Sequence, residues 1–234
     1  MKIQDSVALV TGANRGLGLA FVERLLERGA KKVYAGARDP SSVRLAGVIP
    51  VALDVTQPGS IERLAAELGD VTLLVNNAGV SRGKGALAEG AVARAREEIE
   101  TNYLGPLATS QAFAPILAKN GGGAILNVLS VLSWVTLPTS TTYSASKAAA
   151  WAVTNGLRNE LAAQRTQVVG LHVGYIDTDM AHHVSGPKTS PEEVVRRALD
   201  ALESGDTEVL IDDVSKQVKQ GLSGGVYLHP VPAR

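Results

Sequence analysis

The sequence predicts one α/β domain with a doubly wound parallel sheet of about seven strands and helices on both faces. Short, almost wholly apolar runs alternate along the chain with longer stretches of helical periodicity, which is the pattern of buried parallel strands joined by crossover helices. The 234 residues contain no repeat, linker or low-complexity tract that would divide them. A chain of this length buries a sizeable core alone, so we expect a single domain over residues 1–234.

Seven runs are candidate strands: residues 7–11, 32–37, 48–54, 73–76, 124–128, 168–173 and 208–211. Helical spacing is found over residues 17–28, 60–68, 91–118, 141–164 and 190–203, and one more short helix is expected after Asp212. The third helical stretch contains Pro106 and Pro115, which predict a bend. The fifth opens with Ser190 followed by proline and two glutamates, which is a capping box.

The composition excludes several classes of function. The 23 Lys and Arg residues balance 23 Asp and Glu residues, which argues against a nucleic-acid partner. No apolar run is long enough to span a membrane, and the first strand begins too near Met1 for a signal peptide, so we expect a soluble cytoplasmic protein without a membrane partner. The absence of cysteine excludes disulfides and thiolate sites. His172, His182, His183 and His229 lack a metal-binding spacing, so no metal is expected.

A glycine-rich turn follows the first strand directly. It reads Thr11-Gly12-Ala13-Asn14-Arg15-Gly16-Leu17-Gly18, and a helical stretch begins at once. Residues without a Cβ let the chain reverse tightly, so that backbone N–H groups approach a pyrophosphate at the helix N-terminus. Glycines at this spacing also occur in ordinary βα turns, but the strand-turn-helix context favours nucleotide binding.

The spacing of these glycines, Gly-x3-Gly-x-Gly, resembles the fingerprint of the short-chain dehydrogenase/reductase family. Four further matches follow in the order of that family, over roughly residues 7–180: Asp54, the run Asn76-Asn77-Ala78-Gly79, Asn102, and Ser130 with Tyr143 and Lys147. The resemblance implies a Rossmann-type domain and an oxidoreductase that interconverts a carbonyl and an alcohol by hydride transfer.

The end of the second candidate strand predicts the cofactor. An acid at this place in a dinucleotide fold binds the ribose 2′-hydroxyl, whereas a nearby arginine accommodates a 2′-phosphate. Ala37 stands where NAD-binding members of the family carry the acid, and Arg38 follows it, with Arg15 as a second candidate for the phosphate. We therefore expect NADP(H) rather than NAD(H). Asp39 is the competing sign, since it either reaches a ribose or caps a turn before Pro40.

The resemblance also implies further cofactor contacts. They are Gly12, Asn14, Arg15, Gly16, Leu17 and Gly18 in the glycine turn; Arg38, Asp54 and Val55 on the adenosine side; Asn76, Ala78 and Gly79 after the fourth strand; and Tyr143, Lys147, Gly174, Ile176 and Thr178 around the nicotinamide. Residues 172–178 resemble the family's PGxxxT segment, with Val173 in place of its proline, and this turn is therefore less restrained.

The catalytic prediction rests on spacing. Tyr143 and Lys147 are four residues apart, one turn along the same helix face, and Ser130 precedes Tyr143 by 13 residues. A phenol titrates near pH 10, so a neighbouring ammonium, and the positive ring of an oxidised nicotinamide, are expected to lower its pKa. Tyr143 is then the general acid or base and Lys147 tunes it. Lys147 also binds the nicotinamide ribose, as in the family.

Two further side chains complete this catalytic prediction. Ser130 donates to the substrate oxygen, where negative charge develops as hydride reaches the carbon. Asn102 resembles the family residue that holds a water in a proton relay through Lys147. Ser133 is a rival for Ser130, but only 10 residues separate it from Tyr143, so it fits the pocket lining better.

The substrate side is expected to be apolar. Ser133, Trp134, Leu137, Tyr175 and Met180 are the candidate pocket residues, under a short lid at about 179–190, and they favour a neutral, hydrophobic aldehyde or ketone. A homodimer or homotetramer is expected. Two alternatives stay open: an NAD-dependent alcohol dehydrogenase of the same family, and a catalytically silent NADP-binding sensor or scaffold.

Overall fold

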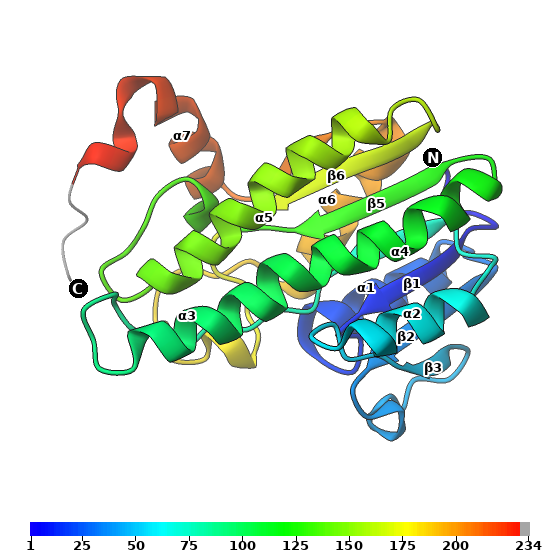
Figure 1. Cartoon of the computed structure of the whole chain (residues 1–234). Helices are drawn as coiled ribbons and strands as arrows, with labels where there is room; N and C mark the ends of the chain where they lie inside the picture. The colour runs from blue at the N-terminus through cyan, green and yellow to red at the C-terminus, as the bar shows by residue number, and fades with distance from the viewer. Residues whose placement is uncertain (230–234) are drawn as a thin grey trace.

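The structure, a computed structural model, describes residues 1–229. One parallel sheet contains β1 (Val7–Thr11), β2 (Lys32–Ala37), β3 (Ile49–Ala52), β4 (Leu73–Asn76), β5 (Gly123–Val128), β6 (Thr166–His172) and β7 (Glu208–Leu210). The order of the strands is β3-β2-β1-β4-β5-β6-β7, and every neighbouring pair is parallel (Figure 1). The predicted doubly wound fold is confirmed.

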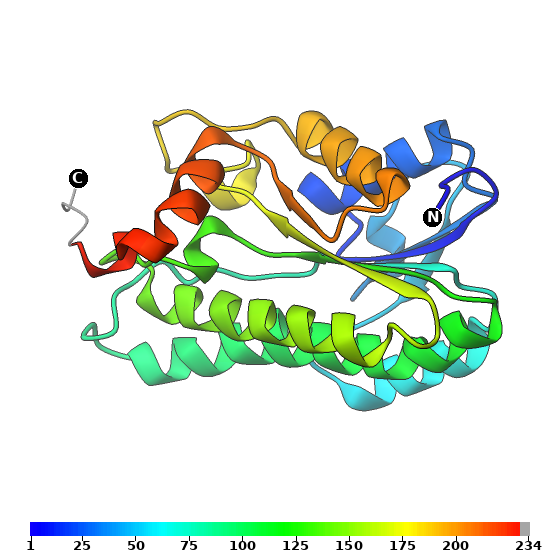
Figure 2. The same ribbon diagram turned by 90° about the horizontal axis from the view of Figure 1, so that it is seen from above.

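Helices cover both faces of this sheet. On one face α1 (Gly16–Glu27) packs beside α6 (Pro191–Ser204), and on the other lie α2 (Pro58–Glu67), α4 (Gly105–Lys119) and α5 (Thr141–Glu160). Figure 2 shows the sheet between these two layers. The helix α3 (Ala91–Ile99) precedes α4, and α7 (Asp213–Gly221) follows β7. Short 3-10 turns are η1 (Pro40–Ser42), η3 (Val131–Ser133) and η4 (Asp179–Ala181).

The two faces of the sheet bury separate apolar clusters. In β1, Ala8 and Val10 belong to the cluster under α1 and α6, whereas Val7 and Leu9 belong to the cluster under α2 and α4. Every residue of β1 and of β4 is buried, which explains why these strands read as continuous apolar runs rather than alternating ones. A sheet packed on both faces holds the ends of its strands rigidly.

The long helical stretch predicted at residues 91–118 departs from the expected simple bend. A π-helical turn, Glu100–Leu104, lies between α3 and α4 and places Pro106 at the start of α4, where a missing N–H costs little. Pro115 lies inside α4. The helix α5 ends at Glu160, earlier than predicted, and Arg165 then turns the chain into β6 with a φ of 61°.

The topology creates one edge suited to a ligand. The strand order reverses between β1 and β4, and the carboxyl ends of parallel strands there open the crevice in which such sheets bind their ligands. Within residues 1–229, no helix is sufficiently long and apolar to cross a lipid bilayer.

Candidate active site

The glycine turn between β1 and α1 has the conformation that its sequence predicts. Gly12 and Gly16 have φ angles of 67° and 53°, in the left-handed region that side chains disfavour. A Cβ at Gly18 would overlap the carbonyl oxygen of Gly12. Leu17 is buried in the apolar cluster beneath α1, whereas Asn14 and Arg15 stay at the surface of the turn. The turn therefore leaves its backbone open beside the N-terminus of α1.

A second turn, after β4, is bound to the first. The Asn77 Nδ2 donates to the carbonyl oxygens of Thr11 and Gly12 at 2.9 and 3.2 Å. The Thr11 hydroxyl accepts from the backbone N–H groups of Asn77 and Ala78, both at 3.0 Å. A Cβ at Gly12 would lie 3.0 Å from the Ala78 Cα, so the two turns form one cradle without room for a further side chain. Thr11 and Asn77 were not expected individually, although both stand within the quoted motifs.

The side chain of Asn76, a predicted cofactor contact, is engaged by the protein itself. Its Nδ2 donates to Ser110 and Asn127 at 3.1 and 2.9 Å, and its Oδ1 accepts from the Thr109 hydroxyl at 2.7 Å. The side chain is 3% exposed. It therefore joins β4 to α4 and β5, and only the backbone of Asn76 is left to face a ligand.

Of the charged side chains near the end of β2, some are paired within the protein and one is left to bind a ligand. The Asp39 carboxylate accepts from the backbone N–H and the hydroxyl of Ser41 at 2.9 and 2.7 Å, which caps η1 and lowers the Asp39 pKa. Arg38 is exposed and makes no ion pair or side-chain hydrogen bond within residues 1–229. Arg15 pairs with Asp179 at 3.1 Å, with both side chains largely exposed, and such a pair is easily displaced.

The turn after β3 holds Asp54 and Val55. The Asp54 Oδ1 accepts from the backbone N–H and hydroxyl of Thr56 at 3.0 and 2.7 Å, so this carboxylate stabilises its own turn. Val55 packs against Gly105 at the start of α4, where a Cβ would lie 3.0 Å from the Val55 Cγ2. Both residues lie at the carboxyl end of β3, on the β2 side of the cradle.

Three polar side chains meet between α5 and the end of β5. Tyr143 and Lys147 project from α5, and Ser130 follows β5 and lies near enough to the Tyr143 phenol to lower its pKa. The Lys147 side chain is 5% exposed; its Nζ donates to the Val128 carbonyl at 2.8 Å and lies 5.8 Å from the centre of the Tyr143 ring. These are the side chains that the spacing predicted to lie together.

Burial sets the proton affinities of this group. It raises the pKa of Tyr143 to about 12, since the nearby Ser130 hydroxyl, which lowers this pKa, has the weaker effect and the charge of Glu98 raises it further. Burial also lowers the pKa of Lys147 to about 8. The Tyr143 result is opposite to the lowering that the sequence suggested, because removing the phenol from water outweighs its neighbours. The phenol keeps its proton at neutral pH.

Asn102 lies in the π-helical turn and faces the second turn of the cradle. Its Oδ1 accepts from the Val80 N–H, and its Nδ2 donates to the Val80 carbonyl and to the Ser146 hydroxyl, at 2.8, 2.8 and 2.9 Å. A Cβ at Gly79 would lie 3.3 Å from Asn102 Oδ1 and 3.8 Å from Lys147 Nζ.

Glu98, one turn before Asn102, was missed by the sequence analysis. It is fully buried, its Oε1 accepts from the Arg82 N–H at 2.7 Å, and its Oε2 has no hydrogen-bond partner among residues 1–229. Asn102 and Glu98 thus hold alternate residues of the segment after β4, Val80 and Arg82. An acid in an amphipathic stretch usually faces solvent, so no local signal distinguishes Glu98 from its neighbour Glu97.

Four of the expected pocket residues lie around the Ser130 loop and the segment after β6. The Ser133 hydroxyl accepts from the Ser130 N–H at 3.4 Å. Leu137 is partly buried, and Tyr175 and Met180 are 42% and 49% exposed. Leu137, Tyr175 and Met180 therefore leave apolar surface exposed, whereas Ser133 is buried.

Trp134 is placed differently from the expected pocket wall. Its indole stacks on His172 with ring centres 3.8 Å apart, meets Trp151 edge-on at 6.2 Å, and lies beneath the Lys219 ammonium at 4.9 Å. The residue is 9% exposed. The protein's own side chains therefore cover this indole, because α7 packs over η3. Trp134 does not form the apolar pocket wall that was expected of it.

The segment after β6 closes over the glycine turn. Thr189 exchanges backbone hydrogen bonds with Tyr175 and Asp177 at 2.9 and 3.0 Å and so anchors the end of the short segment 179–190. A Cβ at Gly16 would lie 3.4 Å from the Thr178 side chain. Gly174, Ile176 and Thr178 thus run from the catalytic end of β6 to the cradle. In the described part of the chain, no group of three metal-binding side chains is present.

This sheet, with its cradle at the strand-order reversal, belongs to the class of dinucleotide-binding α/β proteins. Within that class, the family model of the short chain dehydrogenases matches residues 6–188, and the chain belongs to this family of oxidoreductases. The match ends before α6, β7 and α7.

Known proteins resemble the chain over most of its length. An uncharacterized oxidoreductase of Staphylococcus saprophyticus is 32% identical over 220 residues, covering 87% of this chain and 93% of the relative. The 3-oxoacyl-[acyl-carrier-protein] reductase of Escherichia coli is 33% identical over 199 residues, 79% of each chain. A short chain dehydrogenase from Burkholderia cenocepacia, solved in complex with NADP, is 45% identical with a TM-score of 0.92 and covers 96% of this chain and 95% of its own.

Proposed function

We propose that the protein is an NADP(H)-dependent oxidoreductase that interconverts a ketone or aldehyde and the corresponding alcohol. The observation that carries this proposal is the meeting of Ser130, Tyr143 and Lys147 beside the glycine cradle, with Lys147 Nζ at 5.8 Å from the Tyr143 ring. The residues of the cradle fit a dinucleotide, since Gly12, Gly16 and Gly18 leave space that side chains would fill.

The chain's own residues bind, orient and protonate the substrate. When bound, the nicotinamide cofactor supplies the hydride. The Tyr143 phenol, which holds its proton up to a pKa of about 12, donates it to the substrate oxygen, and the Ser130 hydroxyl stabilises the charge that develops there. Lys147, beside the phenol, would bind the cofactor's ribose. A phenol that stays protonated favours carbonyl reduction at neutral pH, whereas alcohol oxidation requires the phenolate.

The preference for NADP(H) is supported by two charged side chains. Arg38 is exposed at the end of β2, where a 2′-phosphate would lie, and the Asp39 carboxylate is occupied by Ser41. The relative from Burkholderia cenocepacia was solved in complex with NADP. Arg38→Asp is expected to weaken NADPH binding and to leave NADH binding equal or better, measured by the fluorescence of each reduced cofactor. An unchanged order of the two affinities would contradict the proposed preference.

We propose a neutral, hydrophobic carbonyl substrate, because Leu137, in the segment between Ser130 and α5, and Tyr175 and Met180, after β6, leave apolar surface exposed. A panel of ketones and aldehydes with NADPH tests the activity, and Tyr143→Phe is expected to abolish it while keeping NADPH binding. Binding without turnover in the wild type would support the alternative of a silent NADP-binding sensor. Turnover with NAD⁺ and alcohols alone would support the NAD-dependent dehydrogenase.

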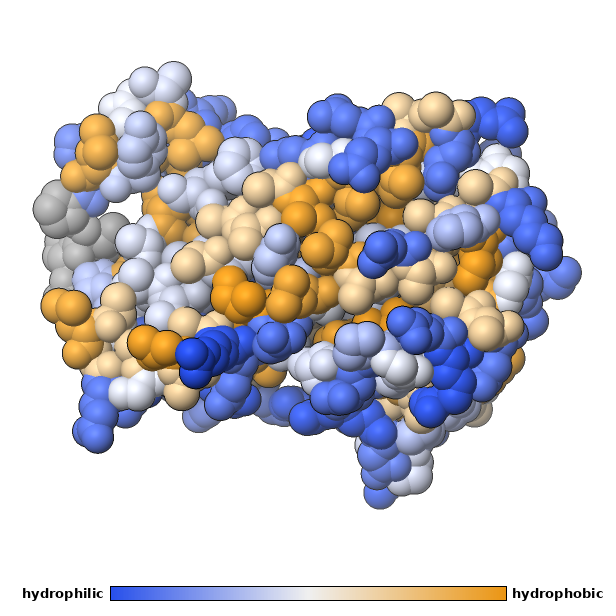
Figure 3. All heavy atoms as spheres, in the orientation of Figure 1, coloured by the Kyte–Doolittle hydropathy of each residue, from blue (hydrophilic) through white to orange (hydrophobic). Residues whose placement is uncertain are grey.

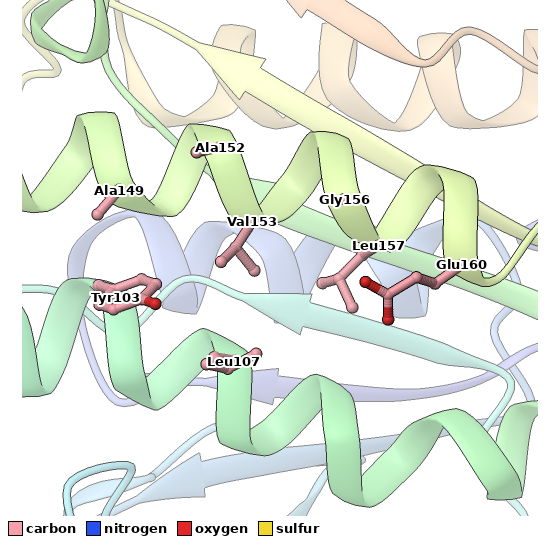
Figure 4. Close-up of a pocket in the computed structure, with 8 residues that line it drawn as sticks. All are labelled: Tyr103, Leu107, Ala149, Ala152, Val153, Gly156, Leu157 and Glu160. Carbon is pink, nitrogen blue, oxygen red and sulfur yellow. The ribbon is translucent and has the colours of Figure 1, made fainter.

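We also propose that two copies associate through α4 and α5. Apolar side chains gather across this face of the molecule (Figure 3), and a groove there is lined by Tyr103, Leu107, Ala149, Ala152, Val153, Gly156, Leu157 and Glu160 (Figure 4). The small residues Ala152 and Gly156 permit close approach of a second helix. Light scattering after gel filtration should give twice the 24.4 kDa of the chain, and Ala152→Arg should give the monomer. A wild-type monomer would refute the association.

A further inference from the structure

The segment after β7 lies outside the residues that the family model matches, and it contacts the active site. Figures 1 and 2 place α7 at the end of the sheet where the loop after β5 lies. Two of its charged residues, Asp212 at the N-cap and Lys219 in the last turn, reach turns that carry Gly174 and Ser130.

Asp212 joins α7 to the turn after β6 through its two carboxylate oxygens. The Oδ2 accepts from the Gly174 N–H at 2.6 Å, and the Oδ1 accepts from the Ser215 N–H at 2.7 Å and so caps α7. A Cβ at Gly174 would lie 3.0 Å from the Asp212 Oδ2. Both oxygens are therefore engaged, and the bond to Gly174 requires the close approach that a glycine permits.

The Gly174 turn determines where the next segment lies over the glycine cradle. The chain runs from Gly174 to Thr178, whose side chain lies 3.4 Å from the position that a Cβ at Gly16 of the cradle would take. Val173 precedes Gly174, so no proline ring restrains the turn where it begins. The charge-assisted hydrogen bond from Gly174 to Asp212 supplies a restraint from a distant part of the chain.

Lys219 gives α7 a second contact with the active site. Its Nζ pairs with Glu208 at 2.8 Å and lies over the Trp134 indole, which stacks on His172. Burial lowers the pKa of His172 to about 4, so its ring is neutral and the Nδ1–H donates to the Ser130 carbonyl at 3.1 Å. Through this stack α7 supports the loop that carries Ser130.

We propose that Asp212 is a positioning residue for cofactor binding, which holds the Gly174 turn and thereby the segment that leads from it to the cradle, and makes α7 part of the active-site architecture. This inference rests on the proposed function, since it takes NADP(H) as the ligand. It identifies an acid beyond the matched family region as a determinant of cofactor affinity.

The test compares two neighbouring acids at the same helix end. Asp212→Ser keeps an N-cap acceptor for α7 but cannot also accept from Gly174, whereas Asp213→Ser removes an exposed carboxylate that pairs only with Lys216 among the described residues. NADPH binding is measured by fluorescence titration, below the melting temperature of each variant. Asp212→Ser should raise the NADPH Kd about tenfold, and Asp213→Ser should leave it unchanged.

Steady-state kinetics separate positioning from general damage. The KM for NADPH should rise in Asp212→Ser while the KM for the carbonyl substrate stays within about twofold, because the Ser130 loop keeps its own support from His172. Equal NADPH Kd values for Asp212→Ser and wild type would overturn the inference, as would equal weakening in both variants. If the wild type binds no NADPH, the proposed function itself fails. If the wild type and both variants bind NADPH equally well, only the inference about Asp212 fails.

Discussion

Replacement of Lys147 by methionine is expected to stabilise the protein while abolishing its activity. Lys147 is 5% exposed, and burial lowers its pKa from 10.5 to about 8. The unfolded chain holds this proton up to about pH 10.5, whereas the folded chain releases it near pH 8, so wild-type stability rises with pH across that window. The cost of the buried ammonium is fully present below pH 8.

The size of the effect follows from the same pKa values. The fall from 10.5 to about 8 corresponds to about 3 kcal/mol. Methionine fills a similar volume, but it leaves the Val128 carbonyl without the donor that Lys147 provides, at a cost of about 1 kcal/mol. The net gain is about 2 kcal/mol at pH 7, which for a chain of 234 residues is about 4–8 °C in Tm.

Urea unfolding and thermal melting at pH 7 and near pH 10 measure this gain. Lys147→Met should exceed the wild type at pH 7 and lose most of its advantage near pH 10, where the wild type no longer buries a charge. Lys31→Met, at an exposed position, is the control and should change stability little at either pH. The reasoning would be refuted if Lys147→Met were less stable than the wild type at pH 7. It would also be refuted if the difference in stability between the two proteins were the same at both pH values.

Three further predictions concern single side chains. Because burial lowers the pKa of His172 from 6.5 to about 4, the wild type should lose about 3 kcal/mol as the pH falls through that window, and His172→Asn should lose correspondingly less in acid urea titrations; parallel curves would be contrary to this. Gly18→Ala should prevent stable folding or NADPH binding, because its Cβ would overlap a backbone carbonyl, whereas Gly59→Ala, with open space around it, should be neutral or stabilising in thermal melts; equal behaviour of the two would be inconsistent with the packing. The charge of Glu98 raises the Tyr143 pKa, so Glu98→Gln should increase the rate of alcohol oxidation at pH 9 by about two- to fivefold. Replacement of the exposed Glu97 by glutamine should leave this rate unchanged. Equal oxidation rates for the two variants would argue against the charge effect.

The local sequence was sufficient to predict the helices and strands, and to predict which site residues of one motif lie together. Apolar runs buried on both faces predicted the strands, and the spacing of Tyr143 and Lys147 predicted one helix face. Helix ends were less predictable. The π-helical turn at Glu100–Leu104 and the early end of α5 depend on how the chain meets the sheet, and no local pattern specifies this.

The surroundings of the site residues were decided by contacts between distant parts of the chain. Burial between α5 and β5 raises the Tyr143 pKa against the effect expected of a neighbouring ammonium. Asn76 lies within its motif, but its amide is taken up by α4 and β5. Trp134 is covered because α7, far along the chain, packs on it.

The sequence by itself determined the parallel sheet, the glycine cradle and the family, because backbone conformation and helix spacing are properties of neighbouring residues. Only the tertiary structure decided which charges are buried and which segment restrains the Gly174 turn. Desolvation and the hydrogen bond to Asp212 arise between residues that meet only after the chain has folded.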